Sequence, residues 1–378
     1  MNLFFTAGTA RGGTNLRTFA LNTNPDIAIS IDALLPLFKY YRHRIVFSEL
    51  WNQSSSLPNW TAPLPDLFNN QEGISNFIKF VNEADDIEIP LLHWEFLIPE
   101  IIKRSSLASG AIISKIGEIS SRTFSEAINE FATIVSATYS HGNAKIVGFQ
   151  ENWIAEFFLP LSRIFPEAKF ISYVRDPRAV LHSSEKHEPD ITKHPAIFSM
   201  ARHIRKHLAL TISYAEAPNF SEKFYFNRYE DFFTNMETYS RGICDFLGIK
   251  ESLLMSDFSK YRDGFLKPIE IPFQVYSDAT SNWKSEGEIE INTTAEFINQ
   301  SEMGYFGYLM SCESSSLTVE IQNYLMDNMR ISMGWKEFDR DLSPQIDWEH
   351  KRLASFHSIS GKKAFESDIY SLIQSLGV

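Results

Sequence analysis

Residues 4–15 read FFTAGTARGGTN, an apolar run followed at once by small residues and a single arginine. The apolar residues LFFTA at 3–7 predict a buried strand, and TNLRTFALN at 14–22 predicts a helix directly after the loop. Glycines let a backbone turn tightly and expose its N–H groups, and the positive end of a helix dipole also favours anions. The stretch therefore predicts a strand, an anion-binding loop and a helix, in that order.

This loop differs from the loop of nucleoside triphosphatases. Gly8 and Gly13 have the spacing of G-x-x-x-x-G-K-[ST], but Thr14 and Asn15 stand where that motif has Lys and Ser/Thr. A metal–triphosphate site is therefore disfavoured, and we expect no metal. Arg11 supplies a cation from within the loop, in a planar fork suited to two oxygens. The residues expected to bind the anion are Arg11, Gly12, Gly13, Thr14 and Asn15. The alternative is a glycine-rich turn that binds nothing.

Strand-like and helix-like runs alternate beyond this loop. We expect further strands at 145–149, 169–174 and 223–229, and helices at 33–42, 74–84, 92–105, 123–140, 153–165 with an interruption near Pro160, 196–217, 233–247, 317–335 and 363–376. A helix is also expected after residue 177, a loop at 57–70, and irregular structure at 250–300. The alternation predicts an α/β fold with a central, mostly parallel sheet flanked by helices.

Composition limits the possible functions. The chain has 378 residues, of which 44% are hydrophobic and 22% charged, so a large core can form. No repeat or linker is apparent, and we expect one domain over 1–378. The net charge of −12 disfavours nucleic-acid binding in general, although a local basic pocket can still hold an anion.

The two cysteines, Cys244 and Cys312, imply neither a disulfide framework nor a zinc site. No run of 18 apolar residues is present, so we expect no transmembrane helix and no membrane partner. Because the loop begins near residue 4, we expect no signal peptide and a cytoplasmic location.

A second motif is KFISYVRDPRAVLHSSEK at 169–186. Arg175 leaves the carboxyl end of a predicted strand, and Ser183 follows eight residues later, two turns into a helix that starts near Asp176 and Pro177. A guanidinium and a hydroxyl so placed can converge on one phosphate. The alternative is a surface ion pair between Arg175 and Asp176.

The loop, this second motif and FYFNRYEDFFTNMETYSRGICDFLGI at 224–249 together resemble the sulfotransferases that use 3′-phosphoadenosine 5′-phosphosulfate (PAPS). Among these enzymes, the residues of the motifs most resemble those of bacterial, tyrosylprotein and carbohydrate sulfotransferases. The resemblance covers about 3–30, 145–186, 223–249 and, more weakly, 279–287. It implies the P-loop-NTPase-like sulfotransferase fold. A helical insertion at about 45–140 and a C-terminal helical extension at about 300–378 are not matched.

The resemblance also implies roles for individual residues. The loop would bind the 5′-phosphosulfate, Arg175 and Ser183 the 3′-phosphate, and Tyr229 would lie against the adenine. In ATSNWKSEG at 279–287, Trp283 and Lys284 would close over PAPS, with Lys284 reaching the 3′-phosphate or the sulfate. An exposed lysine beside a packed tryptophan is the alternative. Glu230 and Asp231 are expected to cap the helix that follows them.

A general base must take a proton from the acceptor. Asp32, in NPDIAISID and 21 residues after Arg11, resembles the carboxylate of tyrosylprotein and heparan-type enzymes, with Asp in place of their usual Glu. Glu151, after a predicted strand, is the second candidate, and His93 or Glu95 in LLHWEF is the third. Each carboxylate could instead be a helix cap or a surface group. Arg11 is expected to stabilise charge on the leaving 5′-phosphate.

We therefore expect an enzyme that moves a sulfuryl group from PAPS to a hydroxyl or amine and releases adenosine 3′,5′-bisphosphate (PAP). The acidic balance and aromatic content favour a small, secondary-metabolite-like acceptor, cationic or aromatic, over an anionic glycan. The alternatives are a carbohydrate or protein-tyrosine sulfotransferase, a P-loop nucleotide kinase, or a non-catalytic nucleotide-binding module. A kinase would need the missing Gly-Lys-[Ser/Thr], and Arg11 argues against a non-catalytic module. The sequence predicts neither the individual acceptor nor the oligomeric state.

Overall fold

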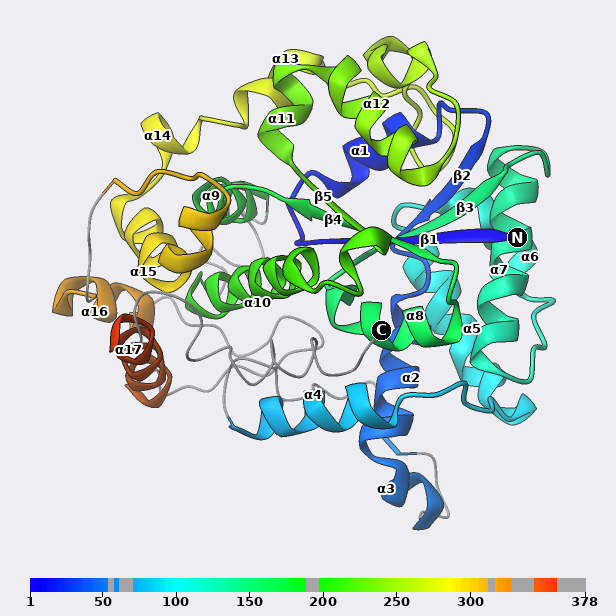
Figure 1. Cartoon of the computed structure of the whole chain (residues 1–378), viewed down its shortest axis with the longest axis horizontal. Coiled ribbons are helices and arrows are strands. Elements are labelled where there is room, and N and C mark those ends of the chain that lie inside the picture. Colours follow the sequence, from blue (N-terminus) through cyan, green and yellow to red (C-terminus); the bar gives the residue numbers. More distant parts are fainter. Residues whose placement is uncertain (54–57, 61–70, 188–196, 312–316, 328–342, 359–378) are drawn as a thin grey trace.

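The computed structural model describes residues 1–53, 58–60, 71–187, 197–311, 317–327 and 343–358. Its centre is a five-stranded sheet in the order β2-β3-β1-β4-β5, with every pair parallel (Figure 1). The strands are β1 (Asn2–Gly8), β2 (Ile27–Ile31), β3 (Ile146–Asn152), β4 (Lys169–Val174) and β5 (Phe224–Arg228). The predicted α/β fold with a parallel sheet flanked by helices is confirmed.

Alternate side chains of β1 build two separate cores. Phe5 faces a core shared with helices α2, α7, α8 and α10, whereas Phe4 faces a core shared with α1 and α12. In Figure 1, α1, α11 and α12 lie above the sheet, and α2, α8 and α10 lie below it. Both faces of the sheet are therefore buried, which explains the continuous apolar run at the start of the chain.

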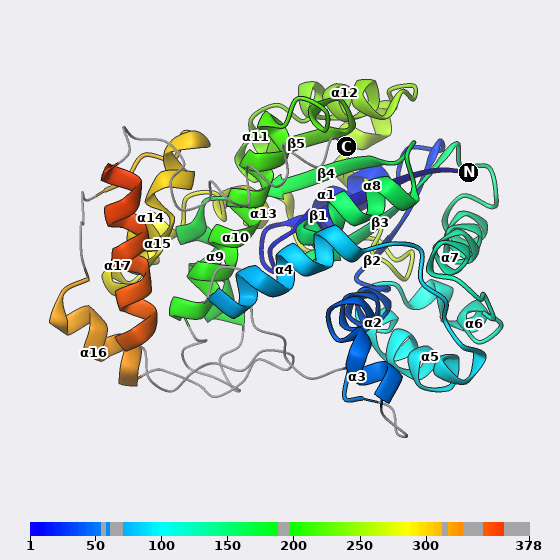
Figure 2. The same cartoon turned by 60° about the horizontal axis from the view of Figure 1, so that its bottom comes forward.

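The helices on the α1 side and around the motifs are α1 (Thr14–Leu21), α9 (Pro177–His187), α11 (Tyr229–Thr234), α12 (Met236–Leu247), α13 (Phe273–Asp278) and α14 (Trp283–Glu286). The helices between β2 and β3 are α2 (Leu35–Val46), α3 (Ser48–Gln53), α4 (Gln71–Glu83), α5 (Leu91–Ser105), α6 (Ile113–Ile116) and α7 (Phe124–Tyr139). The remaining described helices are α8 (Phe158–Ile164), α10 (Ile197–Glu216), α15 (Ile289–Tyr305), α16 (Val319–Asp327) and α17 (Ser343–Ser358). Figure 2 shows α15–α17 at one end of the molecule and α5–α7 at the other.

Two sequence expectations were wrong, and one strand was not predicted. The segment 27–31 forms β2, although no strand or helix was expected there. The break in the helix at 153–165 is not at Pro160, because a short 3-10 turn (Ile154–Phe157) precedes α8, and Pro160 lies in its first turn, where its missing N–H costs little. Residues 250–300 are not irregular throughout, since α15 starts at Ile289.

Some expectations fall outside the described residues. These are the helix at 363–376, most of the loop at 57–70, and the part of the helix at 317–335 that follows α16. The single domain, the insertion and the extension stay predictions.

Candidate active site

The carboxyl ends of the five parallel strands meet at one edge of the sheet. Because of the strand order, the segments that leave these ends follow one another in space: Asp32 after β2, Glu151 and Asn152 at the end of β3, the loop 9–13 after β1, Arg175 after β4, and Tyr229 after β5. Open α/β sheets bind ligands at this edge. The fold thus brings the loop and the other motif residues that end strands into one row.

The loop after β1 is a tight turn, and a buried arginine on α1 stabilises it by hydrogen bonds. The N–H of Gly12 donates to the carbonyl of Thr9 at 2.9 Å, and both Arg11 (φ 61°) and Gly13 (φ 75°) adopt the left-handed conformation. Arg17 on α1 donates from Nη2 to the Gly12 carbonyl at 2.6 Å and from Nη1 to Asn227 Oδ1 at 3.0 Å. Arg17 was not among the expected site residues, and it joins the loop to the end of β5.

Tyr229 packs directly against the loop. A Cβ atom at Gly13 would lie 2.2 Å from two carbons of the Tyr229 ring. The phenol donates to the carbonyl of Tyr276 at 3.0 Å, and the guanidinium carbon of Arg175 lies 4.4 Å from the ring centroid. With only 2% of Tyr229 exposed, this arrangement leaves almost no free ring face for an adenine. Tyr229 here supports the loop and Arg175, which differs from the role that the resemblance implied.

Arg11 contacts both residues of the second motif, and the convergence of Arg175 and Ser183 on one phosphate stays a prediction. Arg175 donates from Nη1 to the Arg11 carbonyl at 2.6 Å and from Nη2 to the Ala279 carbonyl at 2.5 Å. Arg11 Nε in turn donates to Ser183 Oγ at 3.2 Å. Arg175 is 5% exposed, and its Nε has no hydrogen-bond partner within the described ranges. Burial lowers the pKa of Arg175, which Tyr229 and Glu230 oppose in part.

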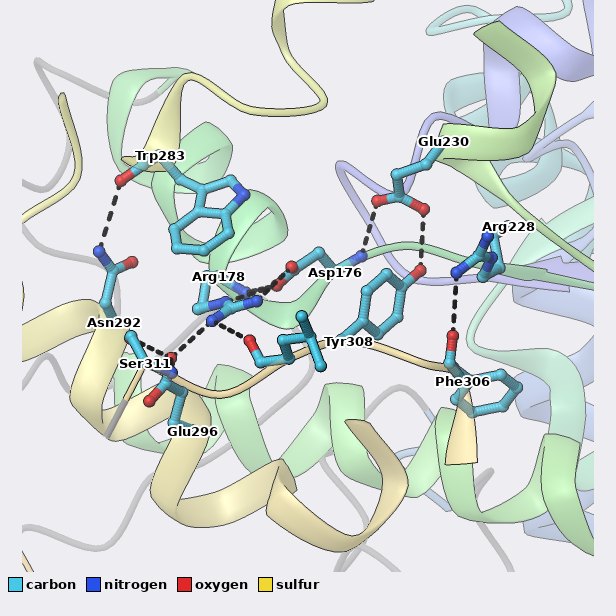
Figure 3. Close-up of polar contacts among 11 residues, drawn as sticks. Asp176, Arg178, Arg228, Glu230, Trp283, Asn292, Glu296, Phe306, Tyr308 and Ser311 are labelled. Atoms are coloured by element: carbon cyan, nitrogen blue, oxygen red, sulfur yellow. Dashed lines mark hydrogen bonds and ion pairs between the residues drawn. The ribbon is translucent and has the colours of Figure 1, made fainter. Parts of the chain in front are cut away.

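The alternative ion pair between Arg175 and Asp176 does not form, because Asp176 pairs with Arg178. Arg178 Nη2 lies 2.8 Å from Asp176 Oδ2, and Arg178 Nη1 lies 2.6 Å from Glu296 Oε1 (Figure 3). The guanidinium of Arg178 also stacks 3.8 Å from the ring centroid of Trp283. Trp283 is therefore packed on Arg178. Lys284 next to it is exposed, with its ammonium 5.7 Å from the same tryptophan ring.

Glu230 ties three segments together rather than capping α11, which has no side-chain cap. It accepts from the N–H of Asp176 at 3.1 Å and from the hydroxyl of Tyr308 at 2.8 Å (Figure 3). Asp231 instead pairs with Arg228 at 2.6 Å. The segment after α15 therefore fixes the starts of α9 and α11, the two elements that follow Arg175 and β5.

Of the two carboxylates at the β2–β3 end of this sheet edge, Asp32 is better placed than Glu151 to act as the general base. Its Oδ1 accepts from the N–H of Asn152 at 3.0 Å, and its Oδ2 accepts from Asn152 Nδ2 at 2.8 Å. Arg104 Nη2 lies 3.1 Å from Oδ2. The Asp32 side chain is 12% exposed. The Glu151 residue is fully buried, and its Oε1 accepts from the N–H of Leu34 at 2.6 Å.

His93 does not join this edge. It lies in the first turn of α5, where its Nδ1 is 2.6 Å from the Tyr40 hydroxyl and its ring packs near Trp51. Arg104, which reaches Asp32, lies eleven residues further along the same helix. At about 1.5 Å of rise per residue, that is about 16 Å along the axis. Glu95 is exposed and also lies in the first half of α5, far from the end that carries Arg104.

Asn152 and Arg104 are site residues that the sequence analysis missed. Asn152 also accepts from the Thr14 hydroxyl at 3.3 Å, so it joins the first residue of α1 to Asp32. Its position at the carboxyl end of a strand, next to Glu151, is a signal that could have found it. No local pattern marks Arg104, which comes from the last turn of a helix far along the chain.

Neither a membrane-spanning helix nor a metal cluster occurs among the described residues. Within them, no helix combines the length and the apolar character that crossing a membrane requires. In the same ranges, no three His, Cys, Asp or Glu side chains gather as metal ligands would.

Two solved structures are similar to this chain at low sequence identity, whereas no curated protein matches the sequence significantly. The sulfotransferase domain of the Synechococcus PCC 7002 olefin synthase is 16% identical, with 78% of this chain and 94% of that domain covered and a TM-score of 0.42. The sulfotransferase domain of the curacin biosynthetic pathway is 13% identical, with 82% and 98% covered and a TM-score of 0.43. At these identities and scores, neither domain's activity is transferred to this chain.

The family model described as "Sulfotransferase family" matches residues 124–252, about a third of the chain. The match includes β3, β4 and β5 and therefore Arg175, Ser183 and Tyr229, whereas the loop after β1 lies before it. Over these residues the chain is similar to the sulfotransferase family.

Proposed function

We propose that the chain transfers a sulfuryl group from PAPS to a hydroxyl or amine of a small acceptor and releases PAP. The observation that carries this proposal is the convergence of two motifs that lie far apart in the sequence. Arg11 in the loop donates to Ser183 on α9, and Arg175 donates to the Arg11 carbonyl. A loop for a 5′-phosphosulfate and a pair of residues for a 3′-phosphate therefore share one site.

The residues present fit such a ligand. The Nε of the buried Arg175 has no hydrogen-bond partner in the described part of the chain, and a phosphate oxygen is a suitable acceptor for it. Helix α1 has no side-chain cap, so the N–H groups of its first turn are available to an anion. A Cβ atom at Gly8 would lie 2.3 Å from Thr14 Cγ2, so glycine there allows α1 to start close to β1.

When bound, PAPS supplies the sulfuryl group, whose sulfur exchanges its bond to the 5′-phosphate oxygen for a bond to the acceptor oxygen or nitrogen. Arg11 and the loop N–H groups stabilise the negative charge that the leaving 5′-phosphate gains. Asp32 accepts the acceptor's proton at Oδ1, which receives one hydrogen bond, whereas Oδ2 has two donors close to it. Asn152 holds both the Thr14 hydroxyl and Asp32.

The order of the strands supports binding of the acceptor and the nucleotide on opposite sides of the loop. Arg175 and Ser183 lie toward β4 and Asp32 follows β2, with the loop between them. The nucleotide then occupies the β4–β5 side and the acceptor the β2–β3 side. The net charge of −12 would repel a large anionic glycan, which favours a small cationic or aromatic acceptor.

Binding of PAP and of AMP, which lacks the 3′-phosphate, tests the nucleotide site by calorimetry. Arg175→Ala should weaken PAP binding by about 2–4 kcal/mol, the scale of a lost charge-assisted contact, and should weaken AMP binding much less. Arg241→Ala removes an exposed arginine and serves as the control. Equal losses for the two nucleotides would mean that Arg175 only holds the Arg11 and Ala279 carbonyls.

Transfer itself is tested with labelled PAPS and a panel of amines, phenols, alcohols and sugars. An enzyme should release PAP in step with labelled acceptor, and Asp32→Asn should lower turnover by about 10²–10⁴ while PAP affinity stays nearly unchanged. PAP binding without transfer to any acceptor of the panel would favour the non-catalytic module.

A further inference from the structure

Asp32 and Glu151 form a buried pair of carboxylates on neighbouring strands. The N–H of Asp32 donates to the carbonyl of Gln150 at 2.7 Å, which places Asp32 beside the end of β3. The negative charge of Asp32 raises the proton affinity of Glu151, because two negative charges this close and this buried are not both stable. The pair therefore favours a state that holds one proton, and its surroundings decide which carboxylate carries it.

The hydrogen-bond donors around the pair are unequal. Asp32 receives two donors from Asn152 and the cationic guanidinium of Arg104 at 3.1 Å. Glu151 accepts from the N–H of Leu34, and its Oε2 has no partner in the described ranges. A negative charge is stabilised where donors and cations are directed at it. The uneven surroundings favour the charge on Asp32 and the proton on Glu151.

Arg104 comes from α5, a helix that carries none of the family motifs. The charged groups that act on the pair are Arg104 and the two carboxylates themselves. Lys39 on α2 and Glu100 on α5 are further charged groups near Arg104, since both Arg104 and Glu100 act on Lys39. Arg104 is thus the cation in direct contact with the carboxylate that faces the ligand edge.

We infer that Arg104 is a positioning residue for the reaction, because it places the negative charge of the carboxylate pair on Asp32 and leaves the proton on Glu151. The inference rests on the proposed function, in which Asp32 is the base. The directions of the pKa shifts agree with it. Burial and the charge of Asp32 raise the pKa of Glu151 well above its usual value, although Arg104 and the N–H groups of Leu34 and Leu35 oppose this rise. Burial also raises the pKa of Asp32, and there Arg104 and Asn152 oppose the rise.

The pH dependence of turnover tests this role. Arg104→Met should move the acid limb of the kcat profile upward by about 1 pH unit or more, because an adjacent cation lowers a carboxyl pKa by that amount. Arg104→Lys, which restores the charge, should return the limb most of the way. Lys103→Met removes an exposed cation from the same helix turn and should leave the profile unchanged. PAP affinity should be the same in all of these variants.

A second measurement determines directly which of the two carboxylates carries the negative charge. In the full chain, infrared titration with Asp32→Asn and Glu151→Gln as difference references should show Asp32 ionising at a lower pH than Glu151. Glu151→Gln, which mimics a protonated carboxyl, should turn over at least about ten times faster than Asp32→Asn. Should Arg104→Met not fold, Arg104→Gln keeps a donor without the charge and makes the same prediction.

The possible results separate the inference from the proposed function. If Asp32→Asn is inactive and Arg104→Met leaves both the acid limb and the Asp32 titration unmoved, the role of Arg104 is refuted. If Glu151→Gln is inactive and Asp32→Asn is not, the charge lies on Glu151, so Asp32 is not the base and the role of Arg104 is refuted, while transfer itself stands. If Asp32→Asn is fully active, Asp32 is not the base, and the infrared titration then decides by itself whether Arg104 places the charge.

Discussion

Gly13→Ala is the sharpest test of how the anion-binding loop is built. The substitution is expected to lower the free energy of unfolding in two separate ways. A non-glycine residue in the left-handed conformation, here φ 75°, costs about 1–2 kcal/mol. The new methyl group would also lie 2.2 Å from the Tyr229 ring, and forced overpacking costs about 1–3 kcal/mol. The free energy of unfolding should therefore fall by about 2–5 kcal/mol.

Two other glycines separate these costs. Gly142 has φ 81°, and a methyl group added there would meet nothing within 4 Å in the described part of the chain, so Gly142→Ala should show the conformational cost alone. Gly304 in α15 has neither problem, and Gly304→Ala should be neutral or stabilise by about 0.5 kcal/mol. Urea unfolding of the three variants measures each cost, and PAP binding should be lost selectively in Gly13→Ala.

The contact with Tyr229 can be isolated by a double mutant. In a Tyr229→Ala background the overpacking cost disappears, so Gly13→Ala should then cost no more than Gly142→Ala. The reasoning is refuted if Gly13→Ala and Gly142→Ala are equally destabilising in the original chain, because Tyr229 would then not pack against the loop.

Three further predictions concern stability. Glu296→Ala should lower the free energy of unfolding by about 1–3 kcal/mol in urea titrations, since it removes one partner of the buried Arg178 while another carboxylate remains. Tyr308→Phe should cost about 1–3 kcal/mol, because the half-buried Glu230 loses a donor, and an unchanged midpoint would contradict this. Because burial raises the pKa of Glu151, its protonated form favours the folded state, and the stability it contributes is lost as pH rises through its folded-state pKa. The slope can reach about 1.4 kcal/mol per pH unit above pH 4.5, and thermal unfolding of Glu151→Gln should show a flatter pH dependence.

Several parts of the site could be predicted from local sequence. The order of strand, loop and helix at 3–22 follows from an apolar run, two glycines and a helical period, all of which act over a few residues. The spacing of Arg175 and Ser183 likewise predicts that Ser183 lies two turns into the helix that follows a strand, which is α9. In the structure both residues contact Arg11, which the spacing alone did not predict.

Other parts had no local signal. β2 is five residues long and follows a proline turn, so its pattern is too short to separate a strand from an extended loop. Trp283 reads locally as a residue that could close over a ligand, but its partner is Arg178 on a helix more than a hundred residues earlier. Tyr229 has an aromatic face in any conformation, and only packing against Gly13 and Arg175 buries it.

The sequence by itself determined the backbone geometry of the loop and the kinds of groups that follow each strand, because these depend on glycine, period and charge over short distances. The tertiary structure decided which of these groups meet. Strand order placed Asp32 next to Glu151, and the end of α5 brought Arg104 to Asp32. The physical reason is that burial and proximity determine the charge of a carboxylate, and both are properties of packing between segments that are distant in the chain.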